Sequence, residues 1–278
     1  MPGTIETRLH DTTLVLTIGN EMKRKALSRD MIDSLRRHPE WAHGDALVAT
    51  AGIIGSGDKA FCSGHDHIEL IECPDAALEP DTNSLFLLPR NIRKPVFAAV
   101  NGPAVVGGLN LAISCDIRIA SNNANFPTTG PRSGLLSIGG QLSVLPQLIG
   151  AGTAMDMLLR SRAVDAARVW DVGLVTELLE DRNALLNSAL EIATALAETP
   201  PALNEEIKGA AWSTMETPGE EHRRVEVERG ETSTILPRRA RGCGNSSKER
   251  QRMRPRTKDT GMYAERGIKA IAKRRSCA

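Results

Sequence analysis

Apolar residues in the first 200 positions follow two spacings, one typical of strands and the other typical of helices. Short alternating or continuous apolar runs predict strands over 7–18, 46–52, 96–100, 117–120 and 174–179. Helical spacing predicts helices over 28–37, 85–92, 107–114, 142–149, 154–158, 165–170 and 183–198. Strands that alternate with helices favour an α/β fold.

Turn-forming and capping residues mark the ends of several of these elements. A hairpin turn is expected at 11–12, inside the first apolar run. Ser28 and Asp165 each precede a helical run, where a side-chain oxygen can cap the helix N-terminus. Gly173 ends the helix that precedes 174–179, and Pro200 stops the helix over 183–198.

The chain has 278 residues, enough for one large domain or for a domain with a small appendage. We expect residues 1–200 to form the core and residues 201–278 to form a helical and basic C-terminal region. Apolar periodicity fades after about Val227, and the stretch 237–256 is rich in Arg, Gly and Ser. We interpret this stretch as a disordered or diverged insertion.

The net charge of +1 conceals an uneven distribution. Residues 231–278 contain 14 Lys and Arg against 4 Asp and Glu, whereas the remainder contains 21 against 30. A basic tail can bind nucleic acid, but Tyr263 is the only aromatic residue in it and offers no stacking platform for bases. We therefore expect a solvated tail and no nucleic-acid partner.

Three further features of the sequence predict a cytoplasmic protein. No apolar run has the roughly 20 residues that a membrane span requires, so no membrane association is expected. The first residues, MPGTIE, lack the basic and apolar parts of a secretory signal. The five cysteines form no C-x-x-C pair, and an odd number without a pattern favours reduced thiols.

Two short segments carry the candidate chemistry. Residues 59–66 read KAFCSGHD, and residues 95–110 read PVFAAVNGPAVVGGLN. In each segment an apolar stretch runs into small residues, where backbone N–H groups can point into a cleft. Two N–H groups that converge on one carbonyl form an oxyanion hole, which stabilises negative charge developing on oxygen. The second segment also opens the helix over 107–114, whose N-terminus favours the same charge. Together the segments predict an enzyme that polarises a carbonyl group.

The chain between about 46 and 179, including both segments, resembles the enoyl-CoA hydratase/isomerase (crotonase) family. The matching motifs are DKAF at 58–61, SGHD at 63–66, KPV at 94–96, NG at 101–102, CDIRIAS at 115–121, LPQLIG at 145–150 and WDVGLV at 170–175. The resemblance implies an α/β fold built as a spiral of ββα units with a C-terminal helical region. It also implies an acyl-CoA substrate, assembly as a homotrimer or hexamer, and no metal or cofactor beyond the coenzyme A of the substrate.

Carried over by motif, the oxyanion hole would consist of the backbone N–H groups of His65 and Gly107. The two glutamates that most hydratases of the family use fall on Asn110 and Gly130. Neither residue can transfer a proton, which puts ordinary hydration in doubt but not the thioester pocket. Asn110 could instead orient a water molecule, or it could be a satisfied polar residue near the start of its helix.

The imidazole of His65 is the candidate replacement for the glutamates, because it titrates near neutral pH. The Gly-His-Asp sequence at 64–66 resembles that of methylmalonyl-CoA decarboxylases of the same superfamily. For His65, a catalytic role, a place in the wall of the acyl-CoA cleft and a structural bond to Asp66 all stay open. Arg132 could hold a substrate carboxylate or be an ordinary surface residue, and His67 could line the cleft wall.

The resemblance further implies a set of contacts with the substrate. The expected substrate-binding residues are Lys25, Leu27, Ser63, Gly64, Asp66, His67, Gly108, Gly130 and Arg132. Lys25 could reach a phosphate of coenzyme A, although an exposed lysine before a helix is an equally good account. Asp66 is expected to brace its loop or position coenzyme A rather than react.

The sequence leaves the reaction open. The first interpretation is an enzyme of the enoyl-CoA hydratase/isomerase type that stabilises an enolate. The second is a decarboxylase of a malonyl-type thioester, which needs the oxyanion hole but not the glutamate pair. The third is an acyl-CoA-binding protein without catalysis, which the missing glutamates and the atypical tail favour. Binding of nucleic acid by the basic tail would instead predict an affinity that falls steeply with salt.

Overall fold

The computed structural model describes residues 3–44, 47–72, 85–128 and 139–216, all within a compact unit that spans Met1–Ser233. The predictions for 237–256 and for most of the C-terminal region therefore lie outside the described residues. None of the helices in the described part of the chain combines the length and the apolar character that crossing a bilayer requires.

The centre of the unit is a six-stranded sheet in the order β1-β2-β3-β4-β5-β8. The pair β1 and β2 is antiparallel, and each later strand is parallel to its neighbour. A second, antiparallel sheet consists of β6 and β7. The strands are β1 Thr4–His10, β2 Thr13–Gly19, β3 Thr50–Gly55, β4 Val96–Val100, β5 Ile117–Ser121, β6 Asn125–Pro127, β7 Ala163–Asp165 and β8 Glu177–Leu179.

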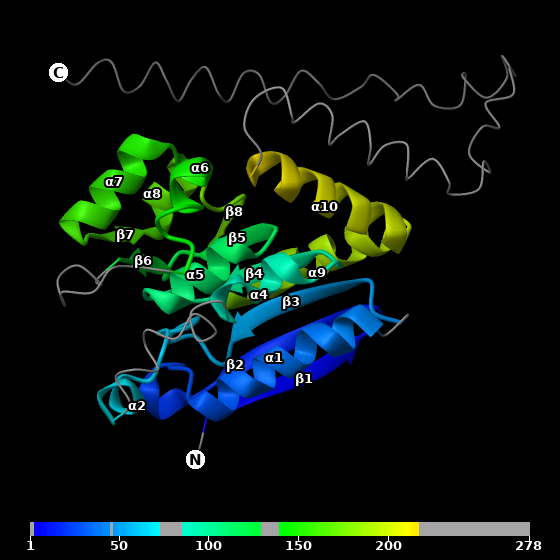
Figure 1. Cartoon of the computed structure of the whole chain (residues 1–278), viewed down its shortest axis with the longest axis horizontal. Coiled ribbons are helices and arrows are strands. Elements are labelled where there is room, and N and C mark those ends of the chain that lie inside the picture. Colours follow the sequence, from blue (N-terminus) through cyan, green and yellow to red (C-terminus); the bar gives the residue numbers. More distant parts are fainter. Residues whose placement is uncertain (1–2, 45–46, 73–84, 129–138, 217–278) are drawn as a thin grey trace, which may run out of the picture. The chain divides into compact units, whose positions relative to one another are not determined.

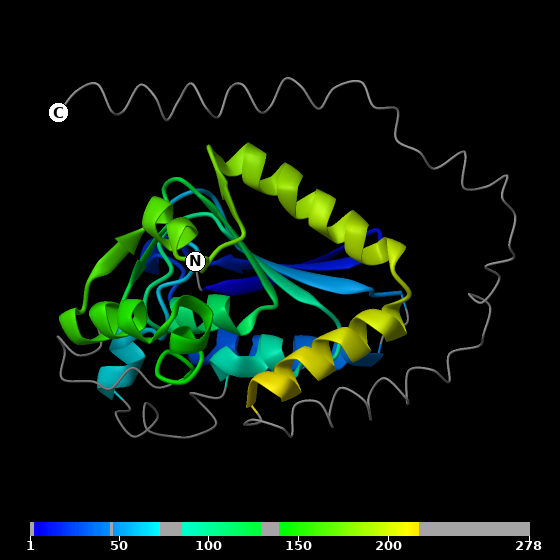
Figure 2. The same ribbon diagram turned by 90° about the horizontal axis from the view of Figure 1, so that it is seen from above.

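Helices cover both faces of the six-stranded sheet. The α-helices are α1 Arg29–Gly44, α2 His67–Glu72, α4 Leu88–Asn91, α5 Gly107–Ser114, α6 Leu145–Ile149, α7 Ala151–Arg160, α8 Ala166–Asp171, α9 Arg182–Glu198 and α10 Pro201–Glu216, and the short 3-10 helices are η1 Glu21–Lys23 and η3 Leu85–Leu87. Figure 1 shows α6, α7 and α8 grouped beyond β5. Figure 2 shows α9 on one face of the sheet and α1 and α5 on the other. The α/β fold is therefore confirmed.

A second row of extended segments runs beside the main sheet and carries the candidate chemistry. Isolated parallel bridges join Leu27 to His65 and Cys62 to Ala104. The row continues into β6, because Ala104 N–H donates to the Asn125 carbonyl at 2.8 Å. Successive turns of the chain thus contribute a sheet strand, a segment of this second row and then a helix, which is the spiral that the resemblance implies.

Most of the predicted turns, helix caps and helices are confirmed. Asp11 has a φ of 52° in the turn between β1 and β2, and Gly173 has a φ of 76° after α8. Asp165 caps α8 by accepting from Arg168 N–H at 2.8 Å. The helices over 107–114 and 183–198 are α5 and α9. The helix over 85–92 is divided into η3 and α4.

Two predicted strands were placed incorrectly. The strand expected at 46–52 is β3, which begins only at Thr50 and continues through Gly55. Every residue of β3 is buried, including Gly52 and Gly55, so these glycines belong to the interior of the sheet. The strand expected at 174–179 is reduced to β8, because Leu174 and Val175 pack into the core before the strand begins.

Alternation along the central strands divides the core between the two faces of the sheet. Ile53 and Ala98 face the larger cluster, which includes the apolar residues of α1 and α5. Ile54 and Phe97 face the opposite cluster, which α9 covers with Leu185. Because β3 and β4 are buried on both faces, they read as continuous apolar runs rather than alternating ones.

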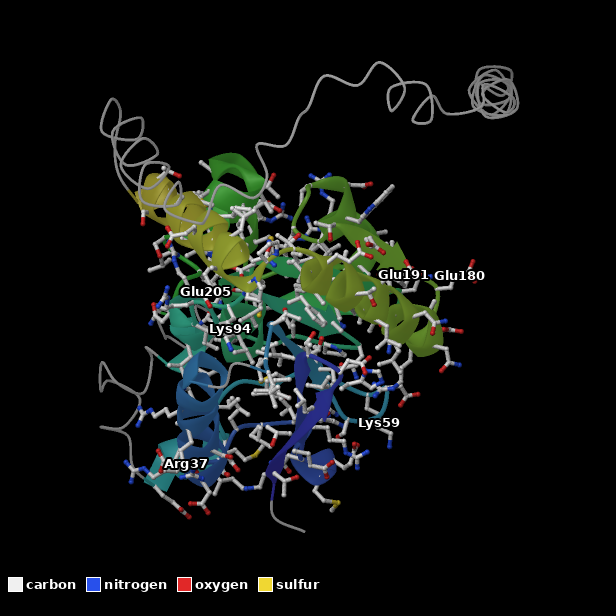
Figure 3. All side chains as sticks on the ribbon, turned by 90° about the vertical axis from the view of Figure 1, so that its right-hand side faces the viewer. Arg37, Lys59, Lys94, Glu180, Glu191 and Glu205 are labelled. Atoms are coloured by element: carbon white, nitrogen blue, oxygen red, sulfur yellow. The ribbon has the colours of Figure 1, made fainter. Side chains whose placement is uncertain are left out.

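Helix α10 begins at Pro201, and it packs on the core through a buried charge. The Lys208 ammonium forms an ion pair with the Asp116 carboxylate at 2.8 Å and donates to the Pro89 carbonyl at 2.7 Å. Trp212 Nε1 donates to the same carboxylate at 2.6 Å. Glu205 and Lys94, both labelled in Figure 3, lie at this junction, where Lys208 also donates to the Lys94 carbonyl at 3.1 Å.

We expect Lys208→Met to lower the free energy of unfolding by about 2–3 kcal/mol, because the partly buried Asp116 carboxylate and two carbonyls lose a charged donor. Burial lowers the pKa of Lys208, and Asp116 partly offsets that effect. The measurement is urea unfolding followed by circular dichroism. Lys59→Met, at an exposed position labelled in Figure 3, is the matched control and should change stability by less than about 0.5 kcal/mol. Equal values for the two variants would contradict the anchoring role.

Candidate functional site

The segment that contains the SGHD motif is held from both sides by backbone hydrogen bonds. On one side Leu27 N–H donates to the Gly64 carbonyl at 2.7 Å, and Asp66 N–H donates to the Leu27 carbonyl at 3.0 Å. On the other side Val105 N–H donates to the Cys62 carbonyl at 2.9 Å. The segment is therefore fixed at both edges before any side chain contributes.

The two segments predicted from the sequence meet at the start of α5. A β-carbon on Gly64 would lie 3.0 Å from the amide nitrogen of Gly107, and one on Gly107 would lie 2.8 Å from the Gly64 α-carbon. One on Gly108 would lie only 2.0 Å from the Cys62 carbonyl oxygen. Glycine is thus required here because the two backbones touch. Gly64 also has a φ of 79°, in the left-handed region.

His65 lies in the middle of this contact. The two hydrogen bonds to Leu27 use the Gly64 carbonyl and the Asp66 N–H, which both point toward the segment of Leu27. Because peptide groups alternate along an extended segment, the His65 N–H points to the opposite side. The half-buried imidazole packs edge-on against Phe86, with 4.8 Å between ring centroids. A β-carbon on Gly107 would lie 2.5 Å from the same Phe86 ring, so this ring borders both His65 and the start of α5.

The residues expected to contact coenzyme A gather on the other side of the loop. Asp66 is buried and forms an ion pair with Lys23, and its Oδ1 accepts from Ile68 N–H at 3.0 Å. Burial alone would raise the pKa of Asp66, but Lys23 and the backbone N–H groups of Ile68 and Glu69 together outweigh burial and hold this pKa below its ordinary value. Ser63 Oγ donates to the Arg24 carbonyl. Asp66 therefore braces the loop, as one of its two predicted roles requires.

Lys25 is placed differently from an exposed phosphate-binding lysine. Its side chain is buried, and its ammonium lies 2.7 Å from the Glu21 carboxylate, which is itself exposed. Leu27 is also buried, below the loop that its backbone holds. Lys23 is one of the exposed cations of this region, and the sequence did not distinguish it from Lys25.

The residue before the oxyanion segment has a strained backbone. Val106 has a φ of 44° and a ψ of −92°, a combination that is unfavourable for a β-branched residue. Three hydrogen bonds hold it there. Its N–H donates to the Pro127 carbonyl at 3.2 Å, and its carbonyl accepts from Asn110 N–H at 2.9 Å and from Gln141 Nε2 at 2.9 Å. The constraint fixes the first peptide of α5.

Asn110 is buried on the first turn of α5, and its side chain is oriented by Gln141. Gln141 Nε2 donates to Asn110 Oδ1 at 2.8 Å. Gln141 itself is fully buried, and within the described residues its Oε1 has no hydrogen-bond partner. Nothing in the sequence pointed to Gln141, because a lone glutamine after two glycines matches no catalytic spacing.

The structure thus brings together His65, Gly107, Gly108, Asn110 and the loop of Ser63, Gly64 and Asp66. His67 begins α2, and nothing is described of its side chain. Gly130 and Arg132 lie outside the described residues, so their predicted roles stay predictions. Burial raises the pKa of the Cys62 thiol to about 12, so this cysteine is not a nucleophile. No metal-binding group of three or more His, Cys, Asp or Glu occurs in the described part of the chain.

The chain is similar to known proteins in both sequence and fold. The model of the enoyl-CoA hydratase/isomerase family matches residues 9–236. The (E)-benzylidenesuccinyl-CoA hydratase of Thauera aromatica is 32% identical over 215 residues, 76% of this chain and 82% of that protein. The short-chain-enoyl-CoA hydratase of Clostridium acetobutylicum is 32% identical over 190 residues, which are 67% of this chain and 72% of that protein. The crystal structure of an enoyl-CoA hydratase from Polaromonas sp. JS666 superposes with a TM-score of 0.78 at 25% identity, covering 84% of this chain and 93% of that one.

We expect Val106→Gly to leave the protein about 1–2 kcal/mol more stable than Val105→Gly, because only the first substitution relieves backbone strain. Both valines are half-buried neighbours, so the loss of side-chain packing and the added chain entropy are matched. The measurement is the free energy of unfolding of the two variants in urea. Equal losses in both variants would show that Val106 is not strained in the folded protein.

Proposed function

Because the chain belongs to the enoyl-CoA hydratase/isomerase family, we propose that it acts on acyl-CoA thioesters through an enolate. The N–H groups of His65 and Gly107 form the oxyanion hole in this proposal. The observation that carries it is the direct backbone contact between Gly64 and Gly107 at the start of α5. That contact brings two segments, about forty residues apart in the sequence, to one point where a carbonyl oxygen can be held.

The proposed hole acts on charge that develops during the reaction. As the thioester is converted to an enolate, its oxygen gains negative charge, and fixed N–H donors stabilise that charge more than they stabilise the substrate. The N-terminal dipole of α5 acts in the same direction. Removal of one such donor typically lowers the rate by about 10²–10³-fold.

Proton transfer is assigned to a group other than Asn110. A carboxamide has no useful proton-transfer pKa, and the oxygen of this one already accepts from Gln141. The half-buried His65 imidazole adjoins the proposed hole and is the described side chain best suited to move a proton to or from the substrate. Hydration would add a hydroxyl at the β-carbon and a proton at the α-carbon, whereas isomerisation would only move a proton.

The Asn110 amide favours decarboxylation of a malonyl-type thioester as the second candidate. In that reaction the bond between the α-carbon and the carboxylate breaks, carbon dioxide leaves and the electron pair enters the enolate. The enolate then takes one proton at the α-carbon. This step requires the oxyanion hole but no carboxylate base, and it is compatible with an amide at position 110 that presents its nitrogen.

The remaining parts of the proposal concern assembly and location. We propose a homotrimer or hexamer in the cytoplasm, as the family resemblance and the cysteine pattern suggest. Exposed large apolar side chains support an assembly, among them Leu159 at 72% exposure and Trp170 at 52%, on α7 and α8.

Incubation of the purified protein with 2-enoyl-, 3-enoyl- and methylmalonyl-CoA, followed by mass spectrometry, tests the function. Gain of water identifies hydration, loss of carbon dioxide identifies decarboxylation, and a moved double bond at unchanged mass identifies isomerisation. Binding of coenzyme A thioesters without any product would select the non-catalytic interpretation. Absence of binding to every thioester would contradict the proposal as a whole.

For the thioester that is converted, we expect His65→Ala to lower kcat by about 10²–10⁴-fold, because the substitution removes the proton-transfer group but keeps the backbone N–H. Thioester affinity should change little for the same reason. His10→Ala, at an exposed position of β1, is the matched control and should retain full activity. Full activity of His65→Ala would restrict the role of His65 to its backbone.

A further inference from the structure

We propose that Gln141 is a positioning residue that fixes the direction of the Gly107 N–H by holding the carbonyl of the same peptide group. The inference rests on the proposed function, since it concerns one of the two donors of the oxyanion hole. Gln141 lies on a segment that enters α6, and neither the sequence motifs nor the family resemblance assigned it a role.

The argument begins with the planarity of the peptide bond. The carbonyl of Val106 and the N–H of Gly107 belong to one rigid plane and point in opposite directions. Gln141 Nε2 lies 2.9 Å from the Val106 carbonyl oxygen, and Asn110 N–H donates to the same oxygen at 2.9 Å. With two donors on its oxygen, this peptide cannot rotate without losing a buried hydrogen bond. The Gly107 N–H is aimed by the same constraint.

The Val106 carbonyl also determines the orientation of two side-chain amides. A carbonyl oxygen only accepts, so Gln141 must present its nitrogen to it. The second hydrogen of Nε2 is then directed to Asn110, and Asn110 must accept it with Oδ1, which lies 2.8 Å from Nε2. Asn110 consequently turns its Nδ2 away from Gln141. These two hydrogen bonds therefore leave the donor Nδ2, and not the acceptor Oδ1, as the Asn110 atom directed away from Gln141.

Such a support is needed because the peptide begins at a strained residue. Val106 has a φ of 44°, and a β-branched residue relaxes from that conformation by rotation of its flanking peptides. The hydrogen bond from Gln141 opposes this relaxation at the carbonyl that follows. Backbone strain next to a proposed reaction centre is itself expected where the surrounding structure holds it in place.

Gln141 is held firmly enough to act in this way. It is fully buried and follows Gly140, which has a φ of 111°. A β-carbon on Gly140 would lie 3.2 Å from Leu87 and 3.7 Å from Ile113, so this backbone packs against η3 and α5. Val144 N–H donates to the Gly140 carbonyl at 2.7 Å and ties the segment to the start of α6.

The test measures the polarisation of a bound thioester rather than turnover. The probe is cinnamoyl-CoA with a ¹³C-labelled thioester carbonyl, whose infrared stretching frequency falls when the oxygen accepts strong hydrogen bonds. For the wild type we expect a lower frequency in the bound state than in water. Gln141→Met should lose about half of that decrease, because the Gly107 N–H, one of the two donors, no longer points at the thioester oxygen. The dissociation constant should change by less than about threefold.

Two further variants separate the hydrogen bond from packing. Gln141→Ala leaves space for a water molecule that can donate to the Val106 carbonyl, so it should retain more of the frequency decrease than Gln141→Met. A role in packing alone predicts the reverse order, since Met fills the volume and Ala does not. Gln147→Met, the same chemical change at an exposed position of α6, is the matched control and should behave as the wild type.

The outcomes distinguish a failure of the proposed oxyanion hole from a failure of the role proposed for Gln141. A wild-type carbonyl whose frequency does not fall on binding would refute the proposed oxyanion hole. A wild-type decrease that Gln141→Met retains in full would overturn the role of Gln141 and leave the hole intact. Loss greater in Gln141→Ala than in Gln141→Met would also overturn it. Circular dichroism verifies the fold of each variant, and if Gln141→Met does not fold, Gln141→Leu, which also lacks a donor, replaces it with the same expected loss.

Discussion

The candidate site depends on backbone hydrogen bonding of one extended segment to its neighbours on both sides. Residues 62–66 accept from and donate to Leu27 at one edge and to the segment of Val105 at the other. The contact at the start of α5 is so close that Gly64, Gly107 and Gly108 have no room for a β-carbon without displacing backbone. Main-chain geometry, and not a particular side chain, therefore brings the proposed donors together. Substitutions at these glycines act on the position of whole segments.

Side chains then fix the loop of residues 63–66 and the peptide group that follows Val106. Asp66 and Lys23 brace the loop on the side expected to face coenzyme A. Gln141 and Asn110 hold the strained Val106 peptide on the opposite side. Phe86 packs on the His65 ring and borders Gly107. The site thus combines rigid donors for a developing oxyanion with the nearby imidazole of His65.

The sequence predicted much of this arrangement, and the physical reasons are specific. The helix at 107–114 and the cap at Asp165 follow from local patterns, and each is formed by residues that lie close together in the chain. The meeting of 59–66 with 95–110 was predictable because in both segments an apolar stretch runs into small residues, whose N–H groups can point into one cleft. The start of β3 was misplaced, since a strand buried on both faces has no alternation to mark its ends. Gln141 could not have been predicted, because its partners Val106 and Asn110 are about thirty residues away and amide hydrogen bonds require no sequence spacing.

The most direct test of the account is a crystal structure of the protein with a saturated acyl-CoA, such as butyryl-CoA. The distances from the thioester oxygen to the amide nitrogens of His65 and Gly107 are the quantities to measure. The account predicts that both lie at about 3 Å, with the N–H groups pointing at the oxygen. A thioester oxygen that contacts neither amide, in a site otherwise occupied by the ligand, would contradict the proposed chemistry.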